Sequence, residues 1–85
     1  MKLTDFLRDH NYDPKIKIDL IKDDMGEFDS ILIDGDRNTM RFLSDLFKIL
    51  SDDESEESIS LSPNGAGSIY FTTESKLGIY LSLAD

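Results

Sequence analysis

The chain opens with apolar residues at helical spacing. Leu3, Phe6 and Leu7 follow one another at three- and one-residue intervals, so they share one face of a helix. The residue before a proline is disfavoured in the helical conformation, and Pro14 follows shortly afterwards. The pattern predicts a helix of one to two turns that ends near residues 10–11.

The apolar period then changes to two, which is typical of a strand. Ile16, Ile18 and Leu20 alternate with charged residues. Residues 23–27 predict a turn in which Gly26 adopts a positive φ.

A second strand is predicted from 28 to 33. Its uninterrupted apolar run, residues 31–33, predicts burial on both faces. We therefore expect this strand to be central in a sheet.

A long amphipathic helix follows Gly35, with Asp36 as its N-cap. Arg41 and Asp45 are four residues apart, so they can form an ion pair on its polar face. The predicted buried stripe repeats at three and four residues and comprises Met40, Leu43, Leu46, Phe47 and Leu50, widened by Phe42 and Ile49.

The remainder of the chain predicts one acidic loop, residues 51–57, and three short strands. The strands are expected at 58–62, 68–73 and 76–83, where apolar residues alternate. Pro-Asn-Gly-Ala-Gly at 63–67 is a strong turn signal and predicts a hairpin between the first two of them.

These elements predict a single α+β domain over residues 1–85. The expected order is α-β-β-α-β-β-β, an antiparallel five-stranded sheet with one long helix packed on one face.

Charge narrows the classes of partner. Eighteen acidic and nine basic residues give a formal net charge of −9. Such a field repels nucleic acids and anionic membranes and attracts a basic protein, although solubility alone is a sufficient reason for acidity. The chain has no cysteine, no apolar run long enough to span a membrane and no signal-peptide pattern. We expect a cytoplasmic protein.

Catalysis, metals and cofactors find little support. His10 is the single histidine, and no Gly-x-Ser-x-Gly turn is present to supply a nucleophilic serine. We expect His10 to be exposed or to end the first helix. Asp34, Asp36 and Asn38 resemble the start of a calcium loop, but a helix N-cap explains them better. We expect neither an enzyme nor a bound metal or cofactor.

Acidic and aromatic residues are the candidates for partner binding. The acidic candidates are Asp52, Asp53, Glu54, Glu56 and Glu57, with Asp23, Asp24 and Glu27 extending the patch if the fold brings the two loops to one end. The alternative for the acidic run is a solvated connector. Tyr70 and Tyr80 are predicted on the sheet face away from the helix, either as interface anchors or as a cross-strand pair.

Part of the chain resembles the small immunity proteins of bacterial polymorphic toxin systems. The resemblance covers about residues 28–83 and is carried by Ile33-Asp34-Gly35-Asp36, by the helix with Met40, Phe42-Leu43, Leu46 and Leu50, by Ile59-Ser60-Leu61-Ser62-Pro63 and by Leu77-Gly78-Ile79-Tyr80-Leu81. It implies an inhibitor that neutralises a cognate toxin by binding it and blocking its active site. It transfers no catalytic residue. The alternative is a non-enzymatic accessory or regulatory subunit, which could be a homodimer formed through its sheet.

Overall fold

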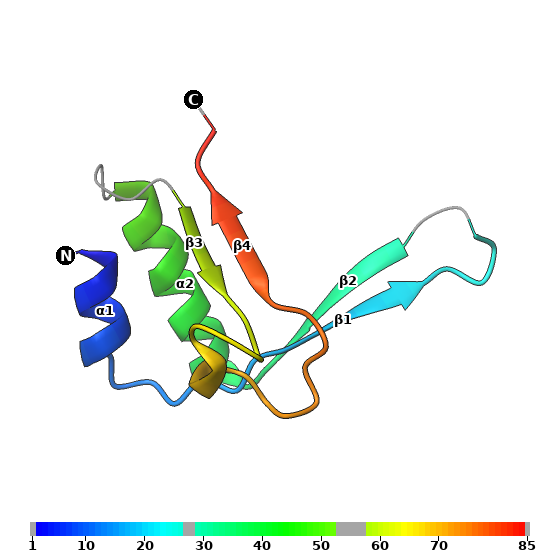
Figure 1. Cartoon of the computed structure of the whole chain (residues 1–85), viewed down its shortest axis with the longest axis horizontal. Helices are drawn as coiled ribbons and strands as arrows, with labels where there is room; N and C mark the ends of the chain where they lie inside the picture. The colour runs from blue at the N-terminus through cyan, green and yellow to red at the C-terminus, as the bar shows by residue number, and fades with distance from the viewer. Residues whose placement is uncertain (1, 27–28, 53–57, 85) are drawn as a thin grey trace.

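The computed structural model describes residues 2–26, 29–52 and 58–84 and is drawn in Figure 1. Within those ranges the elements are α1 (Leu3–Asp9), β1 (Lys17–Lys22), β2 (Asp29–Asp34), α2 (Arg37–Asp52), β3 (Ser58–Leu61), the 3-10 turn η1 (Ser68–Tyr70) and β4 (Ile79–Ser82). The α+β class, the short first helix and the long second helix are as predicted.

The first two strands form the predicted hairpin. β1 and β2 are antiparallel in a continuous register from Lys17 opposite Asp34 to Lys22 opposite Asp29. Gly26 has φ +72° in the connecting turn, as expected for a position where a side chain would be strained.

The predicted five-stranded sheet is wrong. The described residues form two separate two-stranded antiparallel sheets, β1–β2 and β3–β4. The predicted hairpin after 63–67 is also absent, because β3 pairs with β4 instead of with the segment that follows the turn.

The predicted strand at 68–73 is replaced by η1 and an extended segment. Tyr70 and Phe71 are neighbours in sequence, and both are buried. A strand would send them to opposite faces, whereas the transition from 3-10 turn to extended chain turns both toward the core. The Tyr70 hydroxyl donates a 2.8 Å hydrogen bond to the carbonyl oxygen of Leu7, which holds the turn against α1.

Residues 70–77 run along β1 without forming a regular strand. The N–H of Ile16 donates to the carbonyl of Tyr70 (2.9 Å), and the N–H of Thr72 donates to the carbonyl of Ile16 (2.9 Å). Ile16 and Phe71 form a single parallel bridge. β1 therefore lies between β2 and this irregular segment.

The core joins both helices to the inner end of β1 and to residues 61, 70 and 71. Phe42 and Leu46 of α2 are fully buried, whereas Phe47 is 48% exposed and Met40 42% exposed. The predicted burial of Phe47 and Met40 is therefore wrong. The buried residues of α2 are instead Thr39, Phe42, Leu43, Leu46 and Leu50. Leu3 and Phe6 of α1 belong to the same core cluster.

The start of α2 is capped as predicted. Oδ1 of Asp36 accepts hydrogen bonds from the N–H and from the hydroxyl of Thr39, both 2.8 Å long. Both bonds hold the pKa of Asp36 below its usual value, and the bond from the backbone N–H has the larger effect. The expected ion pair is absent among the described residues, since Arg41 donates to Asn38 (3.2 Å) and Asp45 accepts from Tyr12.

Candidate binding surface

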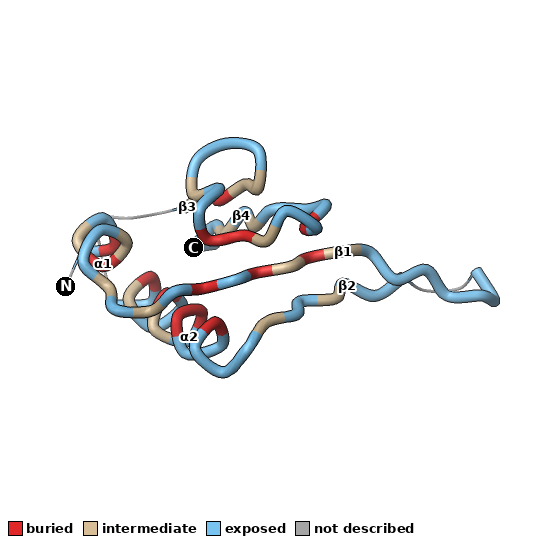
Figure 2. Tube along the Cα trace, turned by 90° about the horizontal axis from the view of Figure 1, so that it is seen from below, coloured by how far each residue is buried: buried red, intermediate tan, exposed pale blue. Residues whose placement is uncertain are grey.

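The β1–β2 hairpin extends from the rest of the molecule as an arm (Figure 1). Ile16 and Ile18, at its inner end, are buried in the core. Beyond Ile18 every described residue of both strands is exposed or half-buried, as Figure 2 shows along the outer part of the arm. The arm therefore presents most of its surface to solvent.

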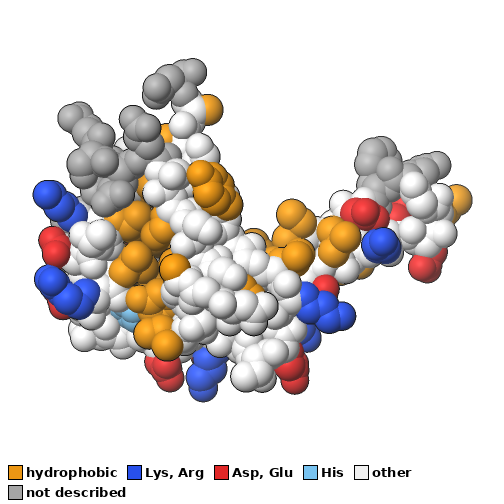
Figure 3. Space-filling model, viewed as in Figure 1, with side chains coloured by type: hydrophobic (Ala, Val, Ile, Leu, Met, Phe, Trp, Pro, Cys, Tyr) orange, Lys and Arg blue, Asp and Glu red, His pale blue; other side chains and the backbone are white. Residues whose placement is uncertain are grey.

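One face of the arm is apolar. Ile18 lies opposite Ile33 and Leu20 opposite Ile31, so all four side chains share a face. Leu20, Ile31 and Ile33 are 42%, 67% and 44% exposed, and we call these three residues the apolar arm face. Figure 3 shows hydrophobic side chains along the arm, with the surface hollowed between the arm and β4.

The exposure of β2 overturns its predicted central place. None of its residues is buried, and it pairs only with β1 among the described residues. A continuous apolar run is typical of a strand covered on both sides, but here no described layer covers the outer part of the arm. The run is therefore largely exposed instead of forming part of the core.

The hydrogen-bonding direction of β1 identifies a free edge on β2. The N–H of Ile18 donates to Oγ of Ser75 (2.8 Å), and its carbonyl accepts from the N–H of Leu77 (3.1 Å), so both groups point away from β2. Ile33 is the partner of Ile18 and therefore belongs, with Ile31, to the non-hydrogen-bonded pairs. The N–H and C=O groups of Ile31 and Ile33 consequently point outward. Within the described ranges, no segment pairs with this edge.

An acidic residue lies at each end of that edge. Asp29 and Asp34 are exposed at the two ends of β2, and neither forms an ion pair with a described residue. On β1, Lys17 is opposite Asp34 but lies 3.7 Å from a carboxylate oxygen of Glu74. Lys22 is opposite Asp29 and forms no ion pair among the described residues.

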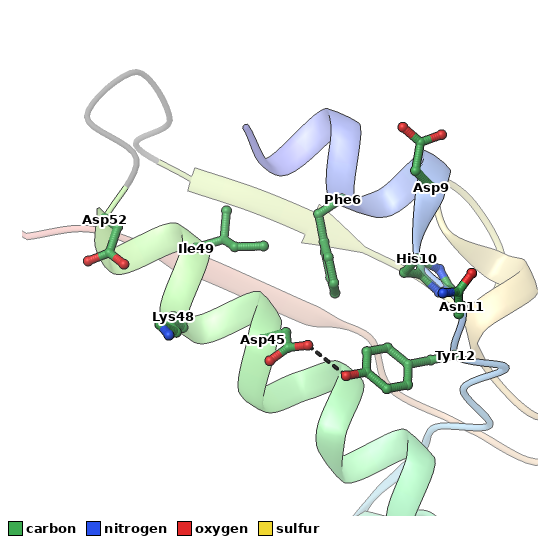
Figure 4. A pocket seen from close by; sticks show the side chains of 9 residues that line it. All are labelled: Phe6, Asp9, His10, Asn11, Tyr12, Asp45, Lys48, Ile49 and Asp52. Carbon is green, nitrogen blue, oxygen red and sulfur yellow. Dashed lines mark hydrogen bonds between the residues drawn. The ribbon is translucent and has the colours of Figure 1, made fainter. Parts of the chain in front are cut away.

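A second hollow, of about 600 Å³, lies between α1 and α2 (Figure 4). The hydroxyl of Tyr12 donates a 2.8 Å hydrogen bond to Oδ2 of Asp45 across it. This bond is the main reason that the pKa of Tyr12 is raised. The other side chains that line the hollow are Phe6, Asp9, His10, Asn11, Lys48, Ile49 and Asp52.

His10 is half-buried, so its expected full exposure is wrong. Its ring lies 4.9 Å from that of Phe42 in an edge-on arrangement and 5.6 Å from that of Phe6. Nδ1 is buried without a hydrogen-bond partner among the described residues. His10 does end α1, because its N–H donates to the carbonyl of Phe6 (3.0 Å). Its half-buried ring extends the aromatic part of the core, which spacing along the chain did not reveal.

The structure does not bring together those of the predicted acidic residues that it describes. Asp52 ends α2 and lines the hollow in Figure 4, whereas Asp23 and Asp24 lie in the turn at the far end of the arm. Figure 1 places the end of α2 and the turn of the arm at opposite ends of the long axis, so the described members of the expected patch lie apart. The other acidic candidates, Glu27, Asp53, Glu54, Glu56 and Glu57, lie outside the described residues.

The two tyrosine candidates also separate. Tyr80, in β4, is 70% exposed and remains available to a partner. The expectation of an exposed Tyr70 is wrong, since its ring packs 5.2 Å from that of Phe42. Burial raises the pKa of Tyr70. The apolar arm face consists of exposed apolar residues that the sequence did not single out.

Comparison with protein-family models, with curated proteins and with solved structures finds no match. In the part of the chain that the structure describes, no helix has the length and apolarity needed to cross a membrane. No group of three or more His, Asp or Glu side chains among the described residues is arranged to hold a metal ion. The arm and the charge together define an acidic α+β chain with an exposed apolar face.

Proposed function

We propose that this chain is a non-enzymatic protein-binding module whose partner is a basic protein, and that it acts in the cytoplasm as an immunity-type inhibitor of a bacterial toxin. The observation that carries the proposal is the apolar arm face, exposed on a chain of net charge −9. Contiguous exposed apolar surface on a small protein is typical of an interface, because its burial is the main source of binding free energy.

The negative net charge of the chain favours a positively charged partner. A strongly acidic surface accelerates association with a basic protein and rejects acidic ones. The acidic residues around the hollow in Figure 4 and at the ends of β2 contribute to that field. Inhibition of a toxin follows from the resemblance to immunity proteins and is the more specific part of the proposal.

The test has two stages. The immobilised chain is exposed to lysate of its native host at low salt, and retained proteins are eluted with a salt gradient and identified. We expect a basic protein that elutes as salt screens the charges. Expression of that protein alone is expected to arrest growth, and co-expression with this chain to restore it. Retention of no basic protein contradicts the binding proposal, while failure to restore growth contradicts the inhibitor.

The second candidate function is a homodimeric accessory subunit, which the free edge of β2 favours. Analytical ultracentrifugation distinguishes the two. A concentration-dependent dimer that persists at high salt supports the accessory subunit, and a monomer under the same conditions supports the inhibitor.

A further inference from the structure

We propose that the free edge of β2 accepts an extended segment of the partner as an added antiparallel or parallel strand, flanked by lysine or arginine. This inference rests on the proposed function and specifies how the partner is recognised. It commits to one occupant, a basic strand-forming segment.

The backbone of β2 is prepared for such pairing. Ile31 and Ile33 each direct one N–H and one C=O outward, and no described residue satisfies them. Main-chain hydrogen bonds of this kind supply much of the affinity when a strand is added to a sheet edge.

Several of the usual protections of an edge strand are missing. Soluble proteins blunt such edges with charged side chains, above all lysine, and with proline, a bulge or a covering segment, and of these β2 has, in the described part of the chain, only the aspartates at its two ends. β2 contains neither proline nor lysine, its register with β1 has no bulge, and within the described ranges nothing covers it. This six-residue strand, unpaired along one edge among the described residues, is long enough to pair with a strand of a partner.

The apolar arm face defines the side chains of the partner. Leu20, Ile31 and Ile33 lie on one face of the hairpin, and an added strand would extend that face by its alternate residues. The partner segment therefore carries apolar residues at every second position, and these cover the apolar arm face.

Charge decides between a basic partner and a second copy. Asp29 and Asp34 stand at the ends of the edge without ion-pair partners among the described residues. Lysine or arginine at the ends of an added strand would neutralise them, whereas a second copy brings another chain of net charge −9 and two more aspartates.

The experiment uses the whole chain, labelled for NMR, and four synthetic peptides. The probe is acetyl-Lys-Val-Thr-Val-Thr-Val-Lys-amide. Two controls are N-methylated at alternate residues, one in each of the two possible frames, which removes the backbone donors of that frame. The third control has glutamate in place of both lysines. At about ten times its dissociation constant, the probe is expected to slow amide exchange of Ile31 and Ile33 about tenfold. The glutamate peptide and the peptide N-methylated in the pairing frame are not expected to slow it.

A pair of variants tests the edge from the side of the protein. Ile31→Pro removes an outward N–H that makes no bond to β1, while Ile31→Val retains that N–H and an apolar, β-branched side chain. We expect the proline variant to abolish protection at Ile33 and the valine variant to retain it. If Ile31→Pro does not fold, the N-methylated peptides decide the question on the unchanged protein.

Three results would overturn the inference: no protection at Ile31 and Ile33, equal protection by the N-methylated peptides, or protection that rises with protein concentration in the absence of peptide, which would identify a second copy as the occupant. If one of these occurs and the chain still retains a basic protein from lysate, the binding function stands and only its place on β2 is wrong. If lysate also yields no basic protein, the proposed function fails independently.

Discussion

The hydroxyl of Ser75 accepts a hydrogen bond of 2.8 Å from the N–H of Ile18, a residue 57 positions earlier in the chain. Ser75 is buried, and its Oγ lies 3.0 Å from the carbonyl oxygen of Leu77, to which it donates. A side chain thus replaces the backbone group that a regular strand would have placed beside β1.

Replacement of Ser75 tests that relationship. Ser75→Ala leaves the N–H of Ile18 buried without an acceptor, so we expect a loss of about 1–3 kcal/mol in the free energy of unfolding. Ser44→Ala, at an exposed position of α2, is the control and should change stability by no more than about 0.5 kcal/mol. Urea denaturation measures both. Equal effects would show that Ser75 does not support β1.

Two adjacent residues of α2 test the position of its buried face. Leu46 is fully buried and Phe47 is 48% exposed. Leu46→Ala is expected to lower the free energy of unfolding by about 2–5 kcal/mol, because it opens a cavity in the core. Phe47→Ala should cost clearly less, although phenylalanine is the larger side chain. The reverse order in thermal or urea unfolding would contradict the orientation of the helix.

Gly67 and Gly26 form a matched pair, since their φ values are +78° and +72°. Because these φ values are left-handed, alanine at either position is expected to lower the free energy of unfolding by about 1–2 kcal/mol. A Cβ at Gly67 would in addition lie 2.6 Å from Cδ2 of Leu61, whereas a Cβ at Gly26 meets no atom within 4 Å. We therefore expect Gly67→Ala to be the more destabilising of the two in thermal unfolding. Equal losses would mean that Leu61 moves aside without cost.

Alkaline pH should weaken the fold through Tyr70. Burial raises its pKa above the usual value of 10.0, so the folded state favours the neutral phenol. The stabilisation is complete below the pKa of the unfolded chain, about 10, and is lost as the pH rises through the folded pKa. In urea titrations across that range, Tyr70→Phe should lose stability less steeply than the unchanged chain. Identical slopes would contradict the prediction.

Local pattern was sufficient for the elements whose determinants are close in sequence. α1, the β1–β2 hairpin and its turn at Gly26, and α2 with its Asp36 cap all follow from periodicity, glycine and capping chemistry. Each depends on residues at most a few positions apart, so a single sequence contains the necessary information.

Periodicity could not identify the members of the buried stripe. Met40 and Phe47 satisfy the same spacing as Leu43 and Leu46, yet only the last two are buried. The stripe of an amphipathic helix is wide, and the part of it that is covered depends on where neighbouring elements such as α1 pack.

The sequence by itself determined the class of the chain, its acidic charge and the elements whose signals are local. Only the tertiary structure decided that β2 is an exposed edge and that Tyr70 and Phe71 both turn into the core. An apolar run reports that its side chains avoid water, but it does not report what covers them. Whether a strand is central or at the edge of a sheet depends on its pairing with distant segments such as residues 70–77. That pairing is a property of the whole fold.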